Sequence, residues 1–394
     1  MVDKTVKFLG FKIYTRLFDD HKYKESFFGG LFTKTLHFKN LFLIYRLFGI
    51  KCCRVEFHLG NKYANFKFFR FYTGKSSSFL LQLVASFVRQ KFDFDKLDII
   101  ALFTKSGETF LLLSHLEKYM QISNISNPVF ISTSEYYRYL ISMFYPQARF
   151  LKVPNIFFEL QISPIKKQVL KDGITRYFNF LPHSHFVDLE SKLCQGEQKN
   201  FVTEVKNTLN LQSPIYKKPT ILNNSVNNAI LKMHTLSLNA KFIFISPEAK
   251  SNLSVSPEFW IKLSKAFLIQ GYDVVFNVMA NSECNSYGKT CFLQIDEARY
   301  VASKAECVIG VRSGFLDVVG NSAKEIHAIY KSFTNRYELK DLESSIVIDA
   351  FSLTYLPDME NTKVYEYDAE SLKEKEILEL VIKRILHKEH KTKL

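Results

Sequence analysis

The chain has 394 residues, 47% of them hydrophobic and 23% charged, and its 53 basic and 39 acidic side chains leave a formal net charge of +14. This composition excludes an intrinsically disordered or collagen-like chain, and the length predicts about two domains. The six cysteines form no CxxC pair and are too few for a disulfide framework, so we expect a reduced, cytoplasmic protein with no metal site. No apolar core and cleavage site follow the first basic residues, so we expect no secretory signal.

Residues 1–90 form a basic, aromatic-rich segment with 16 Lys or Arg, five Asp or Glu, 16 Phe and five Tyr. We favour peripheral contact of this segment with the anionic inner face of the cytoplasmic membrane, with cations at phosphates and rings in the headgroup layer. The main alternative is a β-rich region with Phe in the core and Lys in water. A weaker one is single-stranded nucleic acid, which we do not expect as a partner because no binding motif is present. No apolar run reaches the roughly 18 residues that span a bilayer.

Strands and helices alternate regularly from residue 97. The apolar runs 97–103, 128–132 and 148–153 predict buried strands, and helices are expected after the first and over 135–144. This alternation predicts a parallel sheet that is covered on both faces, within an N-terminal Rossmann-like domain at 91–215.

A second series of strands and helices predicts a C-terminal Rossmann-like domain at 216–350, followed by a tail with a terminal helix at 351–394. The polar stretch 195–235 is expected to link the domains, with a short helix near 226–233. The strands of the second series are expected at 242–245, 272–279, 307–311 and 326–330.

Two helices of this second series carry terminal signals. Ser256 suits the N-cap and Pro257 the first helical position of one helix, which Gly271 is expected to end. Asp296 is expected to cap the other, which runs to Ala305.

Three loops at strand ends are candidates for chemistry, because ligands of open α/β sheets bind beyond the carboxyl ends of strands. The first contains Ser106-Gly107-Glu108, where Glu108 could be a general base that deprotonates an acceptor hydroxyl. The alternative is an ordinary acidic residue in the first turn of a helix, which the helix dipole favours.

The second loop runs from Ser246 and Pro247 to Lys250, and could either hold a diphosphate or be a solvated loop. The third, Gly310-Val311-Arg312-Ser313-Gly314, offers a guanidinium, a hydroxyl and N–H donors to phosphate oxygens. Asp317 follows it and could orient Arg312 or bind a sugar hydroxyl, and a structural Arg–Asp pair is the alternative. Neither a GxxxxGK[ST] nor a GxGxxG pattern is present, which argues against kinases and dinucleotide oxidoreductases.

Over roughly residues 97–335, these motifs resemble GT-B glycosyltransferases of the lipopolysaccharide heptosyltransferase-like family. Gly107-Glu108 is similar to the Gly-Asp of that family's first strand–helix loop, with Glu in place of the Asp regarded as the catalytic base. Ser246-Pro247 and Lys250 are similar to its His-Pro-Gly-type loop and Lys, with Ser in place of His. The segment Gly310–Gly314 is similar to its Gly-Val-Asp-Ser-Gly-like turn, with Arg in place of Asp.

The resemblance implies two Rossmann-like domains facing a cleft. It also implies an inverting, metal-independent transferase that moves a sugar from a nucleotide-diphosphate sugar to a lipopolysaccharide, capsule or related surface glycan, without a cofactor. Glu108 is the expected catalytic base. The expected donor-binding residues are Ser246, Pro247, Lys250, Asp296, Arg312, Ser313, Gly314 and Asp317, and the expected acceptor-binding residues are Lys105, Ser106, His183 and His185.

Two further functional readings stay open. One is a non-catalytic module that binds a nucleotide sugar or glycan within a polysaccharide assembly complex. The other is transfer of a phosphorylated group, which the loop histidines His183 and His185 would allow.

Overall fold

The fold is taken from a computed structural model, which separates the chain into two compact units. Unit 1 comprises Met1–Thr104, Ile125–Glu135 and Ala148–Phe186, and unit 2 comprises Lys105–Asn124, Tyr136–Gln147 and Val187–Leu394. The described residues are 2–8, 11–18, 22–27, 32–37, 42–47, 50–58, 61–65, 70–75, 77–92, 95–155, 160, 167–170, 172–180, 189, 192–193, 195–211, 215–238, 241–249, 255–279, 282–331, 333–335 and 340–391.

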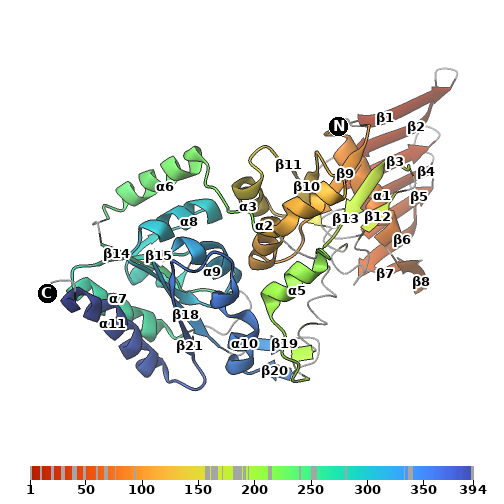
Figure 1. The fold of residues 1–394 in the computed structure, drawn as a ribbon. Helices are drawn as coiled ribbons and strands as arrows, with labels where there is room; N and C mark the ends of the chain where they lie inside the picture. Colours follow the sequence, from red (N-terminus) through yellow and green to blue (C-terminus); the bar gives the residue numbers. More distant parts are fainter. Residues whose placement is uncertain are drawn as a thin grey trace. The chain divides into compact units, whose positions relative to one another are not determined.

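The basic, aromatic-rich segment forms an eight-stranded antiparallel sheet whose strands follow one another in chain order (Figure 1). Its strands are β1 (Val2–Phe8), β2 (Phe11–Phe18), β3 (Lys22–Phe27), β4 (Phe32–His37), β5 (Phe42–Leu47), β6 (Ile50–His58), β7 (Asn61–Asn65) and β8 (Arg70–Lys75). Contact of this segment with a membrane stays a prediction. Among the described residues, no helix is both long and apolar enough to span a bilayer.

Unit 1 also contains a five-stranded sheet in the order β11-β10-β9-β13-β12, parallel except for the antiparallel edge strand β12. Its elements are α1 (Ser77–Arg89), β9 (Leu97–Ala101), β10 (Val129–Ser132), β11 (Arg149–Lys152), β12 (Lys167–Val169) and β13 (Thr175–Phe178). β9 and β10 are buried throughout, as expected for central strands of a parallel sheet. Apolar residues of α1, such as Leu81 and Val84, share one core with Ile99 and Ile131 of these strands.

Unit 2 is built on a six-stranded, fully parallel sheet in the order β16-β15-β14-β17-β18-β21. The strands are β14 (Phe242–Ser246), β15 (Asp273–Asn277), β16 (Lys289–Cys291), β17 (Cys307–Val311), β18 (Glu325–Tyr330) and β21 (Lys363–Asp368). Numbered along the chain this is the order 3-2-1-4-5-6, the arrangement of the doubly wound Rossmann fold. The α/β class expected from the sequence is therefore confirmed, with parallel strands in both units.

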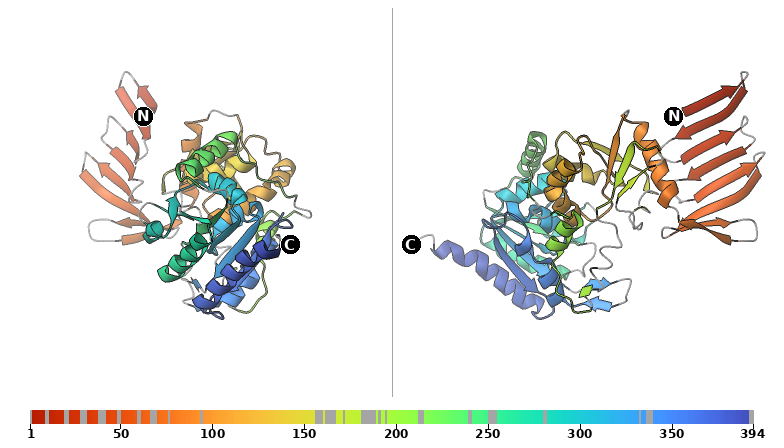
Figure 2. Two further views of the ribbon diagram at one scale, coloured as in Figure 1. Left: turned by 90° about the vertical axis from the view of Figure 1, so that its left-hand side faces the viewer. Right: turned by 45° about the vertical axis from the view of Figure 1, so that its right-hand side comes forward.

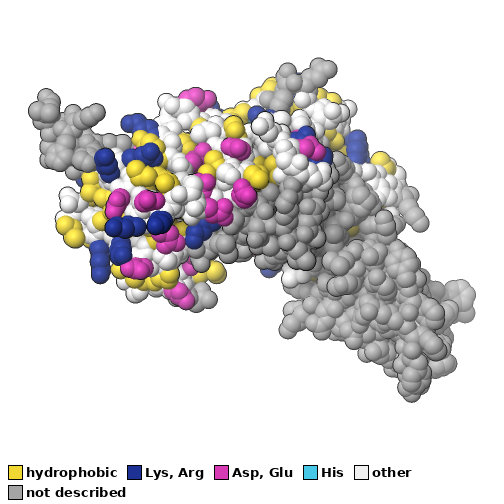
Figure 3. Space-filling model, turned by 90° about the horizontal axis from the view of Figure 1, so that it is seen from below, with side chains coloured by type: hydrophobic (Ala, Val, Ile, Leu, Met, Phe, Trp, Pro, Cys, Tyr) yellow, Lys and Arg dark blue, Asp and Glu magenta, His cyan; other side chains and the backbone are white. Residues whose placement is uncertain are grey.

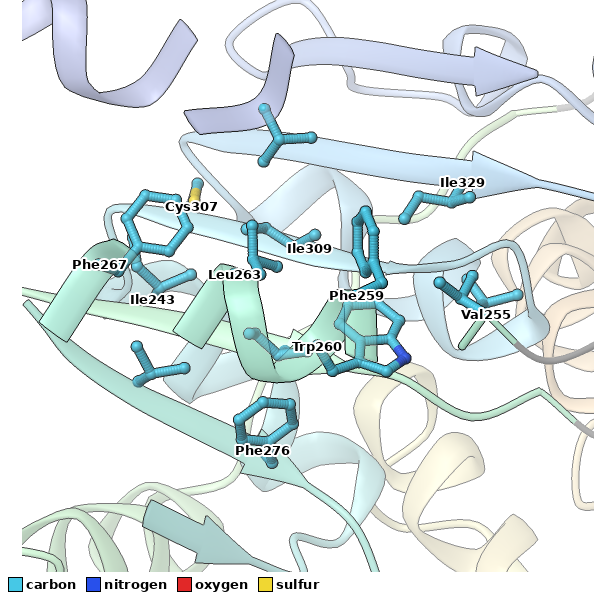
Figure 4. Close-up of a cluster of buried hydrophobic side chains, with 14 of the residues drawn as sticks. Ile243, Val255, Phe259, Trp260, Leu263, Phe267, Phe276, Cys307, Ile309 and Ile329 are labelled. Carbon is cyan, nitrogen blue, oxygen red and sulfur yellow. The ribbon is translucent and has the colours of Figure 1, made fainter. Parts of the chain in front are cut away.

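Helices cover both faces of the unit 2 sheet (Figures 1 and 2). Phe259 and Phe267 of α7 pack with Ile243 and Ile309 of the strands in one apolar cluster, which Val381 of α11 joins (Figure 4). The remaining elements of unit 2 lie around this framework. The helices are α2 (Ser106–Ile122), α3 (Tyr136–Phe144), α5 (Phe201–Thr208), α6 (Asn223–Thr235), α7 (Pro257–Ile269), α8 (Ile295–Lys304), α9 (Gly314–Val319), α10 (Ser344–Phe351) and α11 (Glu374–Lys391), and β19 (Phe333–Asn335) pairs with β20 (Lys340–Leu342).

The helix signals read from the sequence were right for α7, and for α8 they were right at the end, where Ala305 is the C-cap, but wrong at the start. Ser256 caps α7 by accepting a hydrogen bond from the Phe259 N–H at 3.3 Å, and Gly271 follows the helix with a φ of 79°. The N-cap of α8 is Gln294 rather than Asp296, because Glu297 in the first turn accepts the Gln294 N–H at 2.8 Å.

The polar stretch 195–235 contains more helix than expected. It includes α5, whose N-cap Asn200 accepts a hydrogen bond from the Thr203 N–H at 3.1 Å, and the 13-residue helix α6. Both helices belong to unit 2, and α6 packs along α8.

Charge is evenly mixed outside the N-terminal segment. Subtracting the 16 basic and five acidic residues of 1–90 from the totals of 53 and 39 leaves 37 basic against 34 acidic residues. Cationic and anionic side chains lie interspersed over the described surface in Figure 3. The first 90 residues thus carry +11 of the chain's formal net charge of +14.

Candidate functional site

The candidate site lies at the carboxyl ends of β14 and β17, where the strand order of the unit 2 sheet reverses direction. Ser246 and Gly310 are paired in register at these ends. Pro247 continues from β14, and Arg312 and Ser313 continue from β17. Ligands of open α/β sheets bind at such a switch point, so both loops singled out in the sequence stand where that rule places a ligand.

The first turn of α2 packs against the start of α9 with almost no space between them. A Cβ atom on Gly314 would lie 2.6 Å from the Gly107 nitrogen and 2.6 Å from the Ser106 Oγ. A Cβ atom on Gly107 would lie 2.0 Å from Oδ2 of Asp317. Only glycine fits at both positions, so two Ser-Gly pairs more than 200 residues apart in the sequence form one junction.

Arg312 and Asp317 form a buried bidentate ion pair beside this junction. Nη2 of Arg312 lies 2.7 Å from Oδ1 of Asp317, and Nη1 lies 3.1 Å from Oδ2. The guanidinium also donates to the carbonyl oxygens of Ser313 at 2.8 Å and Phe351 at 2.9 Å. This is the Arg–Asp pair that the sequence left as an alternative for the loop, and donor binding by Arg312 stays a prediction.

Glu108 occupies the third position of α2 and is half-buried. Its Oε2 is fully shielded from solvent and has no hydrogen-bond partner among the described residues. Burial raises the pKa of Glu108 above its ordinary value and Asp317 adds to the rise, while Lys105, the Glu108 backbone N–H and Arg312 act in the opposite direction. A carboxyl with a raised pKa and an unused oxygen has the properties of a general base.

Two tyrosines at the start of α3 also belong to this neighbourhood, and the sequence analysis missed them. The rings of Tyr136 and Tyr137 lie 5.7 Å apart, nearly perpendicular to each other. Tyr136 hydrogen-bonds the Ser106 side chain, and Tyr137 is close enough to Glu108 for the carboxylate to raise its pKa further after burial. Both tyrosines could have been found from the sequence, because they begin the helix that follows β10, and helix starts after strands are where ligands bind in such sheets.

Asp296 lies in the first turn of α8 with only 1% of its surface exposed. Its Oδ2 accepts a hydrogen bond from the Ser225 Oγ at 2.5 Å, and its Oδ1 accepts the Glu297 N–H at 3.0 Å. Burial raises the pKa of Asp296, and the bond from Ser225 opposes that rise. The charge of Asp296 also acts on Tyr136, so α8 adds a second buried acid to the surroundings of the α2 start.

The other residues expected in the site have different environments. Lys105 is exposed and is the N-cap of α2. Ser313 has a buried Oγ without a hydrogen-bond partner among the described residues. Lys250, His183 and His185 lie outside the described residues.

The described residues contain no group of three or more His, Cys, Asp and Glu side chains arranged to hold a metal ion. This part of unit 2 contains a carboxyl with a raised pKa, a hydroxyl with no hydrogen-bond partner in the described part of the chain, and an exposed lysine at the start of α2. These groups can move a proton and bind anionic oxygen atoms.

No protein-family model matches the chain, and no curated protein matches it either. The structure is similar to solved structures of family 9 glycosyltransferases, which include heptosyltransferases. One is a family 9 glycosyl transferase from Veillonella parvula DSM 2008, with 12% identity, a TM-score of 0.46, and coverage of 75% of this chain and 99% of that one. Another is the E. coli ADP-heptose lps heptosyltransferase II, with 13% identity, a TM-score of 0.47, and coverage of 75% and 99%.

The E. coli heptosyltransferase WaaC with ADP-2-deoxy-2-fluoro heptose is also similar, with 11% identity and a TM-score of 0.41 over 73% of this chain and 99% of that one. Since all three TM-scores lie below 0.5, we argue function from the residues of this chain itself.

Proposed function

We propose that this protein is a GT-B glycosyltransferase that moves a sugar from a nucleotide-diphosphate sugar to a surface-glycan acceptor. The observation that carries the proposal is the position of Glu108. A carboxyl with a raised pKa and an unpartnered oxygen belongs to the same cluster as the loop that follows β17, at the switch point of a Rossmann-type sheet.

The nucleotide-diphosphate sugar binds at the carboxyl ends of β14 and β17. Ser313 supports this assignment, because its buried hydroxyl lacks a partner that a phosphate oxygen would supply. Ser246, Pro247, Gly314 and Asp296 belong to the same proposed donor site, together with Lys250. Arg312 contributes positive potential there, but its guanidinium is already bound to Asp317, so we expect it to act mainly through that pair.

In the transfer step, Glu108 takes the proton of the acceptor hydroxyl. The hydroxyl oxygen forms a bond to the anomeric carbon while the bond from that carbon to the diphosphate oxygen breaks. The nucleoside diphosphate leaves, and the configuration at the anomeric carbon inverts. Neither metal nor cofactor is part of the proposed reaction.

The acceptor is a glycan or lipid-linked glycan of the lipopolysaccharide or capsule class. Lys105 and Ser106 are proposed to contact it at the start of α2, with His183 and His185 as further candidates. Peripheral contact of residues 1–90 with an anionic membrane would keep the enzyme near a lipid-linked acceptor.

Donor binding can be tested by following the melting temperature in the presence of ADP, GDP, UDP, CDP and CMP and their sugars, with and without EDTA. We expect one nucleoside diphosphate and its sugar to raise Tm equally in both conditions. A rise that EDTA abolishes would contradict metal independence, and no rise with any compound would contradict the proposal. Binding without transfer or hydrolysis would instead support a non-catalytic nucleotide-sugar-binding module.

A further inference from the structure

Asp317 has a feature that donor binding does not explain: its carboxylate packs on the backbone of α2 directly before Glu108. If Gly107 had a Cβ, that atom would lie 2.0 Å from Oδ2 of Asp317 and 2.9 Å from Cγ of Asp317. Asp317 therefore fills the space that a side chain at position 107 would need. Asp317 is only 3% exposed, so solvent screens its charge poorly. The side chain therefore acts on the first turn of α2 both as a spacer and as a charge.

Arg312 holds this carboxylate in one orientation. Both carboxylate oxygens of Asp317 are bound by the guanidinium, at 2.7 and 3.1 Å. The guanidinium is itself fixed by the carbonyl oxygens of Ser313 and Phe351. A bidentate pair held at both ends fixes position as well as charge, which a single exposed ion pair does not do.

We propose that Asp317, oriented by Arg312, is a positioning residue that fixes the first turn of α2 and thereby the location of the Glu108 carboxyl. The proposal rests on the proposed function for its purpose, which is to hold the base in place for catalysis. The charged and titratable groups that act on Glu108 are Lys105 on its own helix, Tyr137 on α3, and Arg312 and Asp317 from the loop after β17 and from α9.

The two members of the pair have opposite effects on Glu108, which makes the proposal testable. Asp317 raises the pKa of Glu108 and Arg312 lowers it, in a site where burial dominates. Asp317→Asn should therefore shift the protonation midpoint of Glu108 to lower pH, because the repelling anion is lost and Arg312 is no longer neutralised. Arg312→Gln should shift it to higher pH.

The midpoint can be followed without substrate as the infrared carboxyl band that is lost in Glu108→Gln. We expect shifts of opposite sign for Asp317→Asn and Arg312→Gln, and no shift for the control Asp273→Asn. Asp273 is also buried and paired, with Lys289 at 2.7 Å, but it belongs to β15 and is not among the groups that act on Glu108. Unchanged midpoints, or shifts of the same sign, would overturn the proposal.

Breaking one member of a buried pair can unfold a protein, whereas replacing both members with apolar residues is often tolerated. If the single variants do not fold, the proposal can be tested with Gly107→Ala instead. In the parent, the new Cβ displaces the Asp317 carboxylate by contact. The double variant Arg312→Met/Asp317→Leu provides the comparison. Gly107→Ala should move the midpoint further in the parent than in the double variant, which has no carboxylate to displace. A similar shift in both would overturn the proposal. The protein could also lack transfer activity while its single variants show midpoint shifts of opposite sign. That result would refute the proposed function but support this inference.

Discussion

The two faces of the unit 2 sheet are packed by different chemistry. On one face, α7 and α11 cover the strands with apolar side chains such as Trp260 and Phe267, both buried (Figure 4). On the other side, the starts of α2, α8 and α9 carry the half-buried Glu108, the buried Asp296 and the buried Arg312–Asp317 pair. Burying charged groups is unfavourable unless something compensates for it, and here the Arg312–Asp317 ion pair and the Ser225 bond to Asp296 do so. We expect substitutions on this side to change the proposed reaction more than stability, and substitutions on the apolar face to do the reverse.

Replacing the proposed base, Glu108, is the change with the largest expected effect on the polar side. Glu108→Gln keeps the shape of the side chain and removes its ability to accept a proton. We expect kcat to fall by roughly 10²–10⁴-fold, the usual contribution of a general base, with donor affinity nearly unchanged. Steady-state kinetics and donor titration measure the two quantities. Glu258→Gln is the control, because Glu258 is also in the first turn of a helix but is exposed and pairs with Lys262 on the helix surface.

Removing a buried ring from the apolar face should lower stability and leave kcat nearly unchanged, which is the reverse of the effect expected for Glu108→Gln. Phe267→Ala deletes a fully buried ring from α7 and should lower the free energy of unfolding by about 3–5 kcal/mol. The kcat of the protein that remains folded should be nearly unchanged, because the ring lies on the face opposite the site. Ile269→Ala in the same helix is the control, since that side chain is 80% exposed and should cost little. A loss of kcat as large as in Glu108→Gln would contradict this separation of the two faces.

At the junction of Gly107 and Gly314, we expect Gly→Ala to lower the stability of the protein, which is the reverse of its usual effect in a helix. Gly→Ala within a helix normally stabilises a protein by about 0.5–1 kcal/mol. Gly314→Ala should instead destabilise it by about 1–3 kcal/mol, because its Cβ would meet the α2 backbone at 2.6 Å. Gly320→Ala, at the other end of α9, is the control because its nearest neighbours lie 3.6 Å away. Chemical denaturation of both variants measures the difference, and equal stability would show that α2 and α9 do not pack as described.

The smallest expected effect is a change in the pH dependence of stability, which follows from the raised pKa of Glu108. A group whose pKa is raised on folding stabilises the native state below its unfolded pKa, and that contribution is lost as the pH rises through the folded value. Glu108→Gln should therefore be more stable than the parent at neutral pH, and this gain should shrink as the pH falls through the raised pKa and vanish below the ordinary pKa of a glutamate. Urea unfolding at several pH values measures this. A gain that grows in acid would mean that the pKa is lowered instead.

The sequence predicted those parts of the fold that depend on local pattern. The buried runs at β9, β14 and β17 and the cap of α7 by Ser256 can be read from neighbouring residues alone. Asp296 shows where such reading fails, because several polar residues competed for one helix start and Gln294 with Glu297 formed the better cap.

The site itself was predictable only in part. Gly107 and Gly314 were each visible as parts of a strand–helix turn, but their contact joins segments far apart in the chain and leaves no local signal. For the same reason Tyr136 and Tyr137 were missed, although they lie close to Ser106 and Glu108. Strand order decides which loops meet, and composition does not encode it.

The measurement that most directly tests this account is the release of nucleoside diphosphate from a bound nucleotide sugar. It would compare the parent protein with Glu108→Gln, using a donor that stabilises both, in the presence of EDTA and a lipid-linked glycan extract. We predict that the parent releases the nucleoside diphosphate and forms a glycosylated product, whereas Glu108→Gln binds the donor and releases almost none. Equal release by the two proteins would contradict the assignment of Glu108 as the base, and with it the central claim.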